Sequence, residues 1–163
     1  MTQLLEERVL ETRIPQDSLY TNLRTYEAPY LEEKLLERVV FVSQEKYQEA
    51  FDEFKKYIYL VKINKDKPIA MVSKQVDEVW HQFILFTQEY HEFCRNIFGK
   101  YLHHIPKTKS KPLDKAGAKN FALLYKETFG SIPSIWGINQ DCTSPGPECA
   151  PEGHCNSTCD RSE

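Results

Sequence analysis

The chain lacks the long apolar runs and the one-sided charge that mark two large classes of protein. No run approaches the roughly 18 uninterrupted apolar residues that a membrane span needs. Its 21 basic and 24 acidic residues are spread along the chain and give a formal net charge of −3, so no basic patch predicts binding to nucleic acid or to an anionic membrane. The N-terminal residues MTQLLEERVLETRIPQ contain no apolar signal-peptide core. We therefore expect a soluble, non-secreted, cytoplasmic protein.

Glycine is scarce, and the familiar catalytic motifs are missing. With six glycines in 163 residues, the chain has no Gly-rich loop of the kind that cradles phosphate. It also has no G-x-S-x-G elbow and no H-E-x-x-H helix. Paired acids such as Glu32-Glu33 lie on charged helix faces, where solvated surface is the ordinary explanation. These absences favour an interaction or metal-binding module over an enzyme.

Apolar spacing predicts an all-α protein with a single compact domain of four to five helices. A short helix over Leu4 to Ile14 and a loop-like arm are expected in residues 1–29. The helical domain is predicted over residues 30–138, with helices at 30–42, 43–61, 73–98 and 113–129. Ser43 and Ser73 are placed to cap the second and third of these helices, because a serine hydroxyl can accept from the first free backbone N–H groups.

Residues 139–163 differ sharply in composition from the rest of the chain. They contain three prolines and four cysteines but no large aliphatic or aromatic side chain, so we predict a flexible, disordered tail. The cysteines follow a C-x6-C-x5-C-x3-C spacing without a C-x2-C pair: Cys142, Cys149, Cys155 and Cys159. They could bind zinc or Cu(I), form disulfides, or remain free thiols. A further alternative is a precursor whose domain presents this tail to a modifying enzyme.

The stretch from Ser73 to Pro106 holds four of the five histidines and the fifth cysteine. Residues 73–98 contain no Gly or Pro, so a single unbroken helix is expected, with Val76, Trp80, Phe83, Tyr90 and Cys94 on a broad core face. Asp77 and His81 lie four residues apart on a more polar side, where the carboxylate can fix the imidazole tautomer. We interpret them as a structural polar pair.

On such a helix, His81 and Cys94 would lie on the order of 20 Å apart, too far to share one metal ion. Gly99 can end the helix, and the next four or five residues can reach back about 15 Å, far enough for His103 or His104 to approach Cys94 but short of His81. The sequence therefore predicts a zinc site at Cys94, His103 and His104, with His91 as a fourth candidate. Adjacent residues of an extended segment point in different directions, so usually one of the two histidines joins a given site.

Two other interpretations of Cys94 stand beside the metal site. A free cysteine in the middle of an apolar face is commonly core filler. A Cys/His-dependent enzyme is the alternative function, and it requires the thiol and an imidazole to meet within about 3 Å at a position that substrate can reach. The sequence also leaves open an unknown protein partner.

The sequence resembles one family through uncommon residues at fixed spacings. The motifs are D-x-x-W-H at Asp77 to His81, T-x-x-Y-x-x-F-C at Thr87 to Cys94, and H-H-x-P at His103 to Pro106. Tyr125, Phe129-Gly130 and Trp136 follow. Over roughly residues 68–137 this pattern resembles the glycine-rich domain-containing protein-like family of bacteria and plants. The resemblance implies a helical domain without an established reaction, and this chain lacks the glycine-rich segment of the plant relatives.

Overall fold

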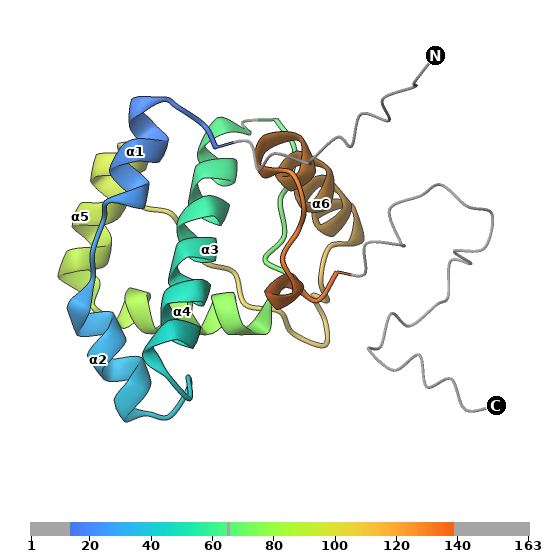
Figure 1. The fold of residues 1–163 in the computed structure, drawn as a ribbon. Coiled ribbons are helices and arrows are strands. Elements are labelled where there is room, and N and C mark those ends of the chain that lie inside the picture. Colours follow the sequence, from blue (N-terminus) through green and yellow to red (C-terminus); the bar gives the residue numbers. More distant parts are fainter. Residues whose placement is uncertain (1–13, 65, 139–163) are drawn as a thin grey trace, which may run out of the picture.

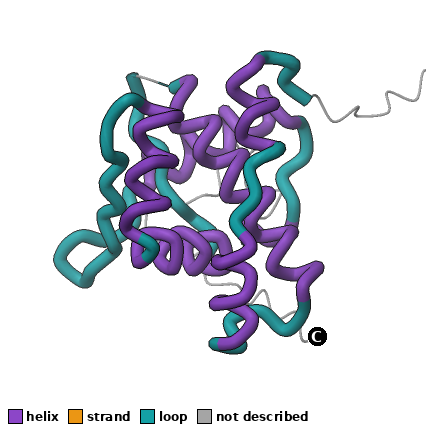
Figure 2. Tube along the Cα trace, turned by 90° about the vertical axis from the view of Figure 1, so that its left-hand side faces the viewer, coloured by secondary structure: helices purple, strands orange, loops and turns teal. Residues whose placement is uncertain are grey.

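The computed structural model describes residues 14–64 and 66–138, and in these residues all regular structure is helical (Figures 1 and 2). The all-α prediction is confirmed. The predictions for residues 4–13 and for the tail, with Cys142, Cys149, Cys155 and Cys159, lie outside the described residues. The described elements are α1 (Ser18–Arg24), α2 (Pro29–Glu37), α3 (Gln44–Ile63), α4 (Lys74–Leu85), α5 (Thr87–Phe98), α6 (Lys115–Phe129) and the 3-10 helix η1 (Ser134–Trp136).

Helix α3 is the centre of the fold: α1, α2, α4 and α6 pack against it, and α5 and η1 pack against α4 (Figure 1). Helix α4 crosses one end of α3, α1 and α2 lie along one side of it, and α6 lies on the other side. The apolar face of α3 consists of Tyr47, Phe51, Phe54 and Ile58, which are all buried. Ser43 and Ser73 cap α3 and α4 as expected, accepting from the N–H groups of Lys46 and Val76. None of the described helices is long and apolar enough to cross a membrane.

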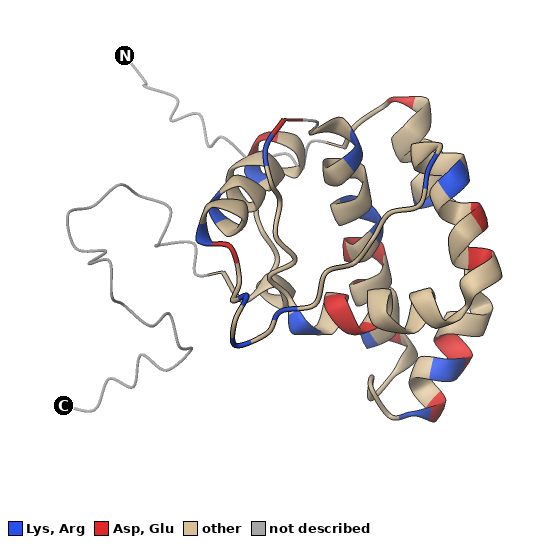
Figure 3. Cartoon of the chain, turned by 180° about the vertical axis from the view of Figure 1, so that it is seen from behind, with Lys and Arg blue, Asp and Glu red and all other residues tan. Residues whose placement is uncertain are grey.

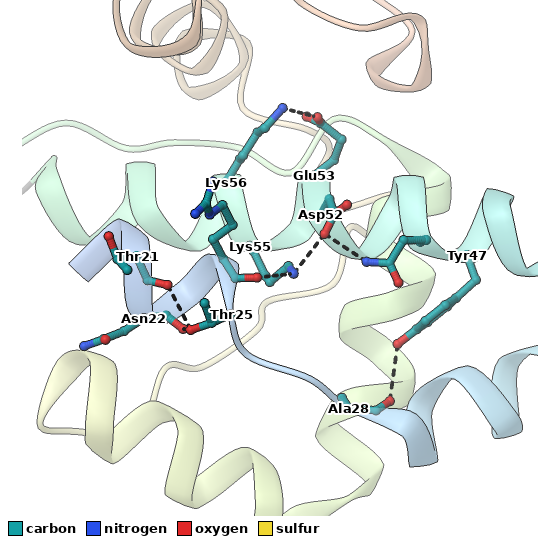
Figure 4. Close-up of polar contacts among 11 residues, drawn as sticks. Thr21, Asn22, Thr25, Ala28, Tyr47, Asp52, Glu53, Lys55 and Lys56 are labelled. Carbon is teal, nitrogen blue, oxygen red and sulfur yellow. Dashed lines mark hydrogen bonds and ion pairs between the residues drawn. The ribbon is translucent and has the colours of Figure 1, made fainter. Parts of the chain in front are cut away.

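The predicted arm before residue 30 is in part a helix, α1. The carboxylate of Asp17 caps it by accepting from the N–H of Tyr20, and Tyr20 and Leu23 are buried in the main core. At the other end of α1, the buried Lys55 donates to the carbonyl of Arg24 at 3.0 Å and pairs with Asp52 at 2.8 Å (Figure 4). The prediction of a loop here was wrong because a seven-residue helix shows little periodicity, and its stability comes from packing on α3.

Asp17 also links α1 to α3, because it accepts a hydrogen bond of 2.5 Å from the hydroxyl of Tyr59. This bond, followed by the one from the Tyr20 N–H, lowers the pKa of Asp17 below its ordinary value of 3.8. A carboxyl whose pKa is lower in the folded state stabilises the fold above the unfolded pKa, and this contribution is lost as pH falls through the folded pKa.

We therefore expect Asp17→Asn to remove part of the acid sensitivity of the fold. Below about pH 4, the free energy of unfolding of the variant should fall less steeply with pH than that of the wild type. Urea unfolding at a series of pH values between 2 and 6 measures both slopes. Tyr59→Phe removes the hydrogen bond that lowers the pKa of Asp17 most, so its free energy of unfolding should also fall less steeply with pH than that of the wild type. Identical slopes for all three proteins would contradict this role of Asp17.

Helix α2 ends earlier than predicted. It stops at Glu37, and Val39 has a positive φ of 55°, which a β-branched residue rarely adopts. Leu31 and Leu35 of α2 are buried, but Val39, which continues their apolar spacing, is 73% exposed. The apolar spacing continues beyond the end of the helix into a turn, which is why the predicted helix was too long.

A buried carboxylate ties α6 and η1 to α3. Glu53 is 4% exposed, and its Oε2 accepts from the hydroxyl of Tyr125 at 2.7 Å and from Trp136 Nε1 at 2.6 Å. Its Oε1 pairs with Lys56 at 2.7 Å. Burial and the charge of Glu53 raise the pKa of Tyr125 far above its ordinary value, so this hydroxyl stays a donor. Helix α6 and η1 are thus both anchored to one acidic side chain of α3.

The predicted unbroken helix over 73–98 is wrong, because it breaks at Phe86. The backbone of Phe86 has ψ of 70°, which ends α4 and begins α5. The break lets Phe93 of α5 pack against both Phe83 of α4 and Tyr26, with ring centroids 5.2 and 5.0 Å apart. Burying a large apolar side chain contributes about 1.5–3 kcal/mol, and Tyr90, Phe93 and Cys94 are all buried. This gain offsets the few helical hydrogen bonds lost at the break.

Candidate functional site

Three side chains from two parts of the chain converge at α4. Asp77 and His81 lie one turn apart on the helix, and His104 comes from residues 100–106, the returning segment that follows α5. His104 Nε2 lies 2.7 Å from His81 Nε2 and 3.0 Å from Asp77 Oδ1, while His81 Nε2 lies 3.5 Å from Asp77 Oδ2. We call these residues the Asp-His-His cluster. Among the described residues, it is the group of potential metal ligands whose donor atoms all lie within 4.8 Å of one another.

A chain of hydrogen bonds fixes the returning segment against α4. Gly99 ends α5 in the left-handed conformation, with φ of 71°, as the sequence predicted. The hydroxyl of Tyr90 accepts from Trp80 Nε1 at 2.9 Å and donates to the carbonyl of Leu102 at 2.6 Å. Burial raises the pKa of Tyr90 far above its ordinary value, so the hydroxyl keeps the proton that it donates. Tyr90 therefore holds α4, α5 and the returning segment together.

The ring of Trp80 completes the positioning of His104. The imidazole of His104 stacks on it, with ring centroids 4.3 Å apart and an angle of 16° between the planes. The side chain of His104 is only 9% exposed, whereas that of His81 is 42% exposed. The cluster thus combines one fixed, nearly buried imidazole with one that borders solvent and has room to adjust.

The carboxylate of Asp77 is incompletely satisfied. Its Oδ1 is buried and accepts no hydrogen bond from the described residues, although His104 Nε2 lies 3.0 Å away. The two Nε2 atoms instead lie at hydrogen-bond distance from each other, so one of them must donate and the other accept. A buried carboxylate oxygen that accepts no hydrogen bond is costly, and such atoms often mark an ion or a catalytic role.

The predicted zinc ligands Cys94, His103 and His104 do not form one group. Cys94 is 1% exposed and lies in the apolar core, in line with the core-filler interpretation. His103 is exposed, and its ring lies near Tyr101, with centroids 4.9 Å apart. Of the three, only His104 joins the Asp-His-His cluster. The predicted fourth partner, His91, is exposed on α5.

The burial of Cys94 also counts against the Cys/His-dependent enzyme, because a nucleophile must be open to substrate. The expected Asp77 and His81 pair does form, and only one of the two adjacent histidines joins the site, as their alternation predicted.

Sequence reasoning failed to connect His104 with His81. On a straight helix to residue 98, the returning segment would fall short of His81. The break at Phe86 separates α4 from α5 and brings the returning segment within reach of His81. The local signal for a new helix was weak: Thr87 precedes Glu89, and an acidic residue in a first turn is typical of a helix start. Without a Gly or Pro, this signal did not outweigh the continuous apolar face.

Comparison with known proteins relates the chain to two plant proteins and to one family. The chain is similar to "Glycine-rich domain-containing protein 1" of Arabidopsis thaliana, with 31% identity over 91 residues, which cover 52% of this chain and 11% of the relative. It is also similar to "Glycine-rich domain-containing protein 2" of the same plant, with 30% identity over 90 residues, 51% of this chain and 11% of the relative. The chain thus spans about a tenth of the length of these relatives. No solved structure matches it.

A family model covers most of the described helices. The model of the UCP032817-like family matches residues 20–126, a span that includes α2 to α5, the Asp-His-His cluster and most of α6. The two plant relatives agree with the resemblance that the Trp-His, Phe-Cys and His-His motifs indicated. The chain therefore belongs to the UCP032817-like family.

Proposed function

We propose that this domain binds a divalent transition metal ion, with zinc as the first candidate, through Asp77, His81 and His104. The observation that carries the proposal is the buried Asp77 Oδ1, which accepts no hydrogen bond from the described residues while two imidazole nitrogens face the same point. A bound cation would satisfy this oxygen and both nitrogens at once.

The donor set suits zinc. Two imidazoles and one carboxylate are frequent zinc ligands, and three protein ligands leave a fourth position for water or another molecule. Ligand atoms at about 2.0 Å from a tetrahedral ion are about 3.3 Å apart. The two Nε2 atoms are 2.7 Å apart, so they must separate slightly to admit the ion. The half-exposed His81 is free to make this movement, while Trp80 holds His104 in place.

The proposal extends to the rest of the chain in two respects. The four tail cysteines offer a second set of ligands for zinc or Cu(I), since soft thiolates favour these ions. The protein works in the reducing environment of the cytoplasm, where such thiols stay available for metal. Because the cluster and the tail offer different ligands, substitutions can separate them.

Metal stoichiometry tests the proposal. We expect a full-length variant with serine at Cys142, Cys149, Cys155 and Cys159 to retain about one zinc ion per chain after dialysis against a weak chelator, measured by elemental analysis. Adding Asp77→Asn to this variant should remove most of that zinc while helicity by circular dichroism stays unchanged. If the variant with serine in the tail holds no zinc and takes up none on titration, the proposal fails.

A further inference from the structure

A cleft opens beside the Asp-His-His cluster. It has a volume of about 320 Å³ and is bounded by the start of α4, the segment before it and the loop that leads to α6. This size is at the lower end of the range for small-molecule sites. Asp77 and His104 both line it, so an ion held by the cluster lies at the wall of the cleft. A ligand in the cleft can therefore reach the ion's fourth position.

The interior of the cleft is mainly apolar. The aromatic side chains of Tyr57 and Trp80 line it and are 3% and 4% exposed, respectively, so they are fixed by the core behind them. Other apolar residues complete the walls: Pro68, Ile69, Met71, Ile105, Pro106, Pro112 and Leu113. A ligand that fills this volume needs an apolar body.

One wall of the cleft is held by backbone contacts with α6. The Ala70 N–H donates to the carbonyl of Gly117 at 3.2 Å, and Asn120 donates to the carbonyl of Pro68 at 3.1 Å. A Cβ at Gly117 would lie 3.1 Å from the Ala70 nitrogen, so glycine permits this close approach. The segment 68–71 is thereby fixed before any ligand arrives, which lowers the entropic cost of binding.

Two cations border the cleft on the loop before α6. Lys107 and Lys111 both line it, and the backbones of Thr108 and Lys111 bond to each other at 3.0 and 3.2 Å to close the turn between the two lysines. Figure 3 shows the blue lysine positions of this loop beside the start of α4. The carboxylate of Asp114 also lines the cleft, but it caps α6 by accepting from Ala116. With the ion in place, the cleft carries a positive charge that favours an anion.

We infer that the cleft binds a small organic carboxylate with an apolar body, whose carboxylate oxygen takes the fourth position on the metal ion. The apolar body packs against Trp80 and Tyr57, and the two lysines attract the negative charge. This inference rests on the proposed metal site and deepens it by naming the ligand class. The ion alone would accept many oxygen donors, and the apolar walls alone would accept many apolar molecules. Together they select a ligand in which an oxygen donor is attached to an apolar group.

Cobalt-loaded protein provides the test, because Co²⁺ replaces zinc at such sites and its visible absorption reports on its ligands. Full-length protein with serine at the four tail cysteines is loaded with Co²⁺ and titrated with phenylacetate, acetate or 2-phenylethanol. We expect phenylacetate to change the spectrum with a dissociation constant at least about 10-fold lower than that of acetate. The alcohol should leave the spectrum unchanged. Lys107→Gln with Lys111→Gln should weaken phenylacetate binding several-fold, whereas the control Lys100→Gln, outside the cleft, should not.

The outcomes separate the two proposals. If Co²⁺ binds but phenylacetate and acetate act with equal affinity, or neither changes the spectrum, this inference is overturned and the metal site stands. If Co²⁺ does not bind to the protein, both are overturned. Equal effects of the cleft and control lysine substitutions would refute the contribution of the lysines and, with it, the assigned charge of the ligand.

Discussion

Replacing His104 with alanine is expected to lower the zinc affinity of the domain by about 100-fold or more, because it removes a direct ligand and the imidazole that Trp80 holds in place. Competition with a zinc-sensitive dye, on protein with serine at the four tail cysteines, measures the change. His81→Ala should have a comparable effect on affinity. Because the His81 side chain is 42% exposed, this second variant should unfold with nearly wild-type stability, so it separates metal binding from folding.

The neighbouring histidine supplies the matched control. His103→Ala removes the same chemical group one residue away, but its side chain lies near Tyr101 and outside the Asp-His-His cluster. We expect its zinc affinity to stay within about 3-fold of the wild type, well under 1 kcal/mol. A larger loss from His103→Ala than from His104→Ala would show that the metal uses the other imidazole and would contradict the assigned ligands.

Replacing Glu53 with alanine should destabilise the fold by about 3–5 kcal/mol, since removing one partner of a buried charged network leaves the others uncompensated. The substitution strands the Tyr125 hydroxyl and the Trp136 N–H in the core and frees Lys56 from its ion pair. It also leaves a cavity at the junction of α3, α6 and η1. Urea unfolding followed by circular dichroism gives the difference in free energy.

Glu53→Gln tests whether the charge or the acceptor matters more. The amide oxygen can still accept from Tyr125 and Trp136, but its NH₂ group then faces Lys56. We expect a loss of about 1–2 kcal/mol, smaller than that for alanine. A cost below about 1 kcal/mol for Glu53→Ala would mean that α6 and η1 are held by apolar packing alone.

The elements that the sequence predicted well depend on local chemistry. Helices α3 and α6 repeat their apolar residues at helical spacing, and Ser43, Ser73 and Gly99 begin or end helices through their own side chain or backbone. Such signals lie within a few residues of the structure that they specify, so one sequence suffices to read them. The pair of Asp77 and His81, four residues apart on one helix, was predictable for the same reason.

What the sequence did not predict depends on contacts between distant residues. Helix α1 is too short to show a period and is held by Lys55 and Tyr59, which lie more than 30 residues away. The break at Phe86 is stabilised by packing of Phe93 against Tyr26, a contact that no local pattern contains. His104 reaches the cluster only because of this break, so the correct ligand set required the tertiary fold.

X-ray absorption at the zinc edge identifies the atoms bound to the ion and so distinguishes the Asp77, His81 and His104 site from a thiol site. The sample is zinc-loaded, full-length protein with serine at the four tail cysteines, in which Cys94 is the one remaining thiol. We expect nitrogen and oxygen neighbours at about 2.0 Å, with the multiple scattering of two imidazoles and no sulfur. A sulfur neighbour at about 2.3 Å would place the ion at Cys94 and contradict the Asp77, His81 and His104 site.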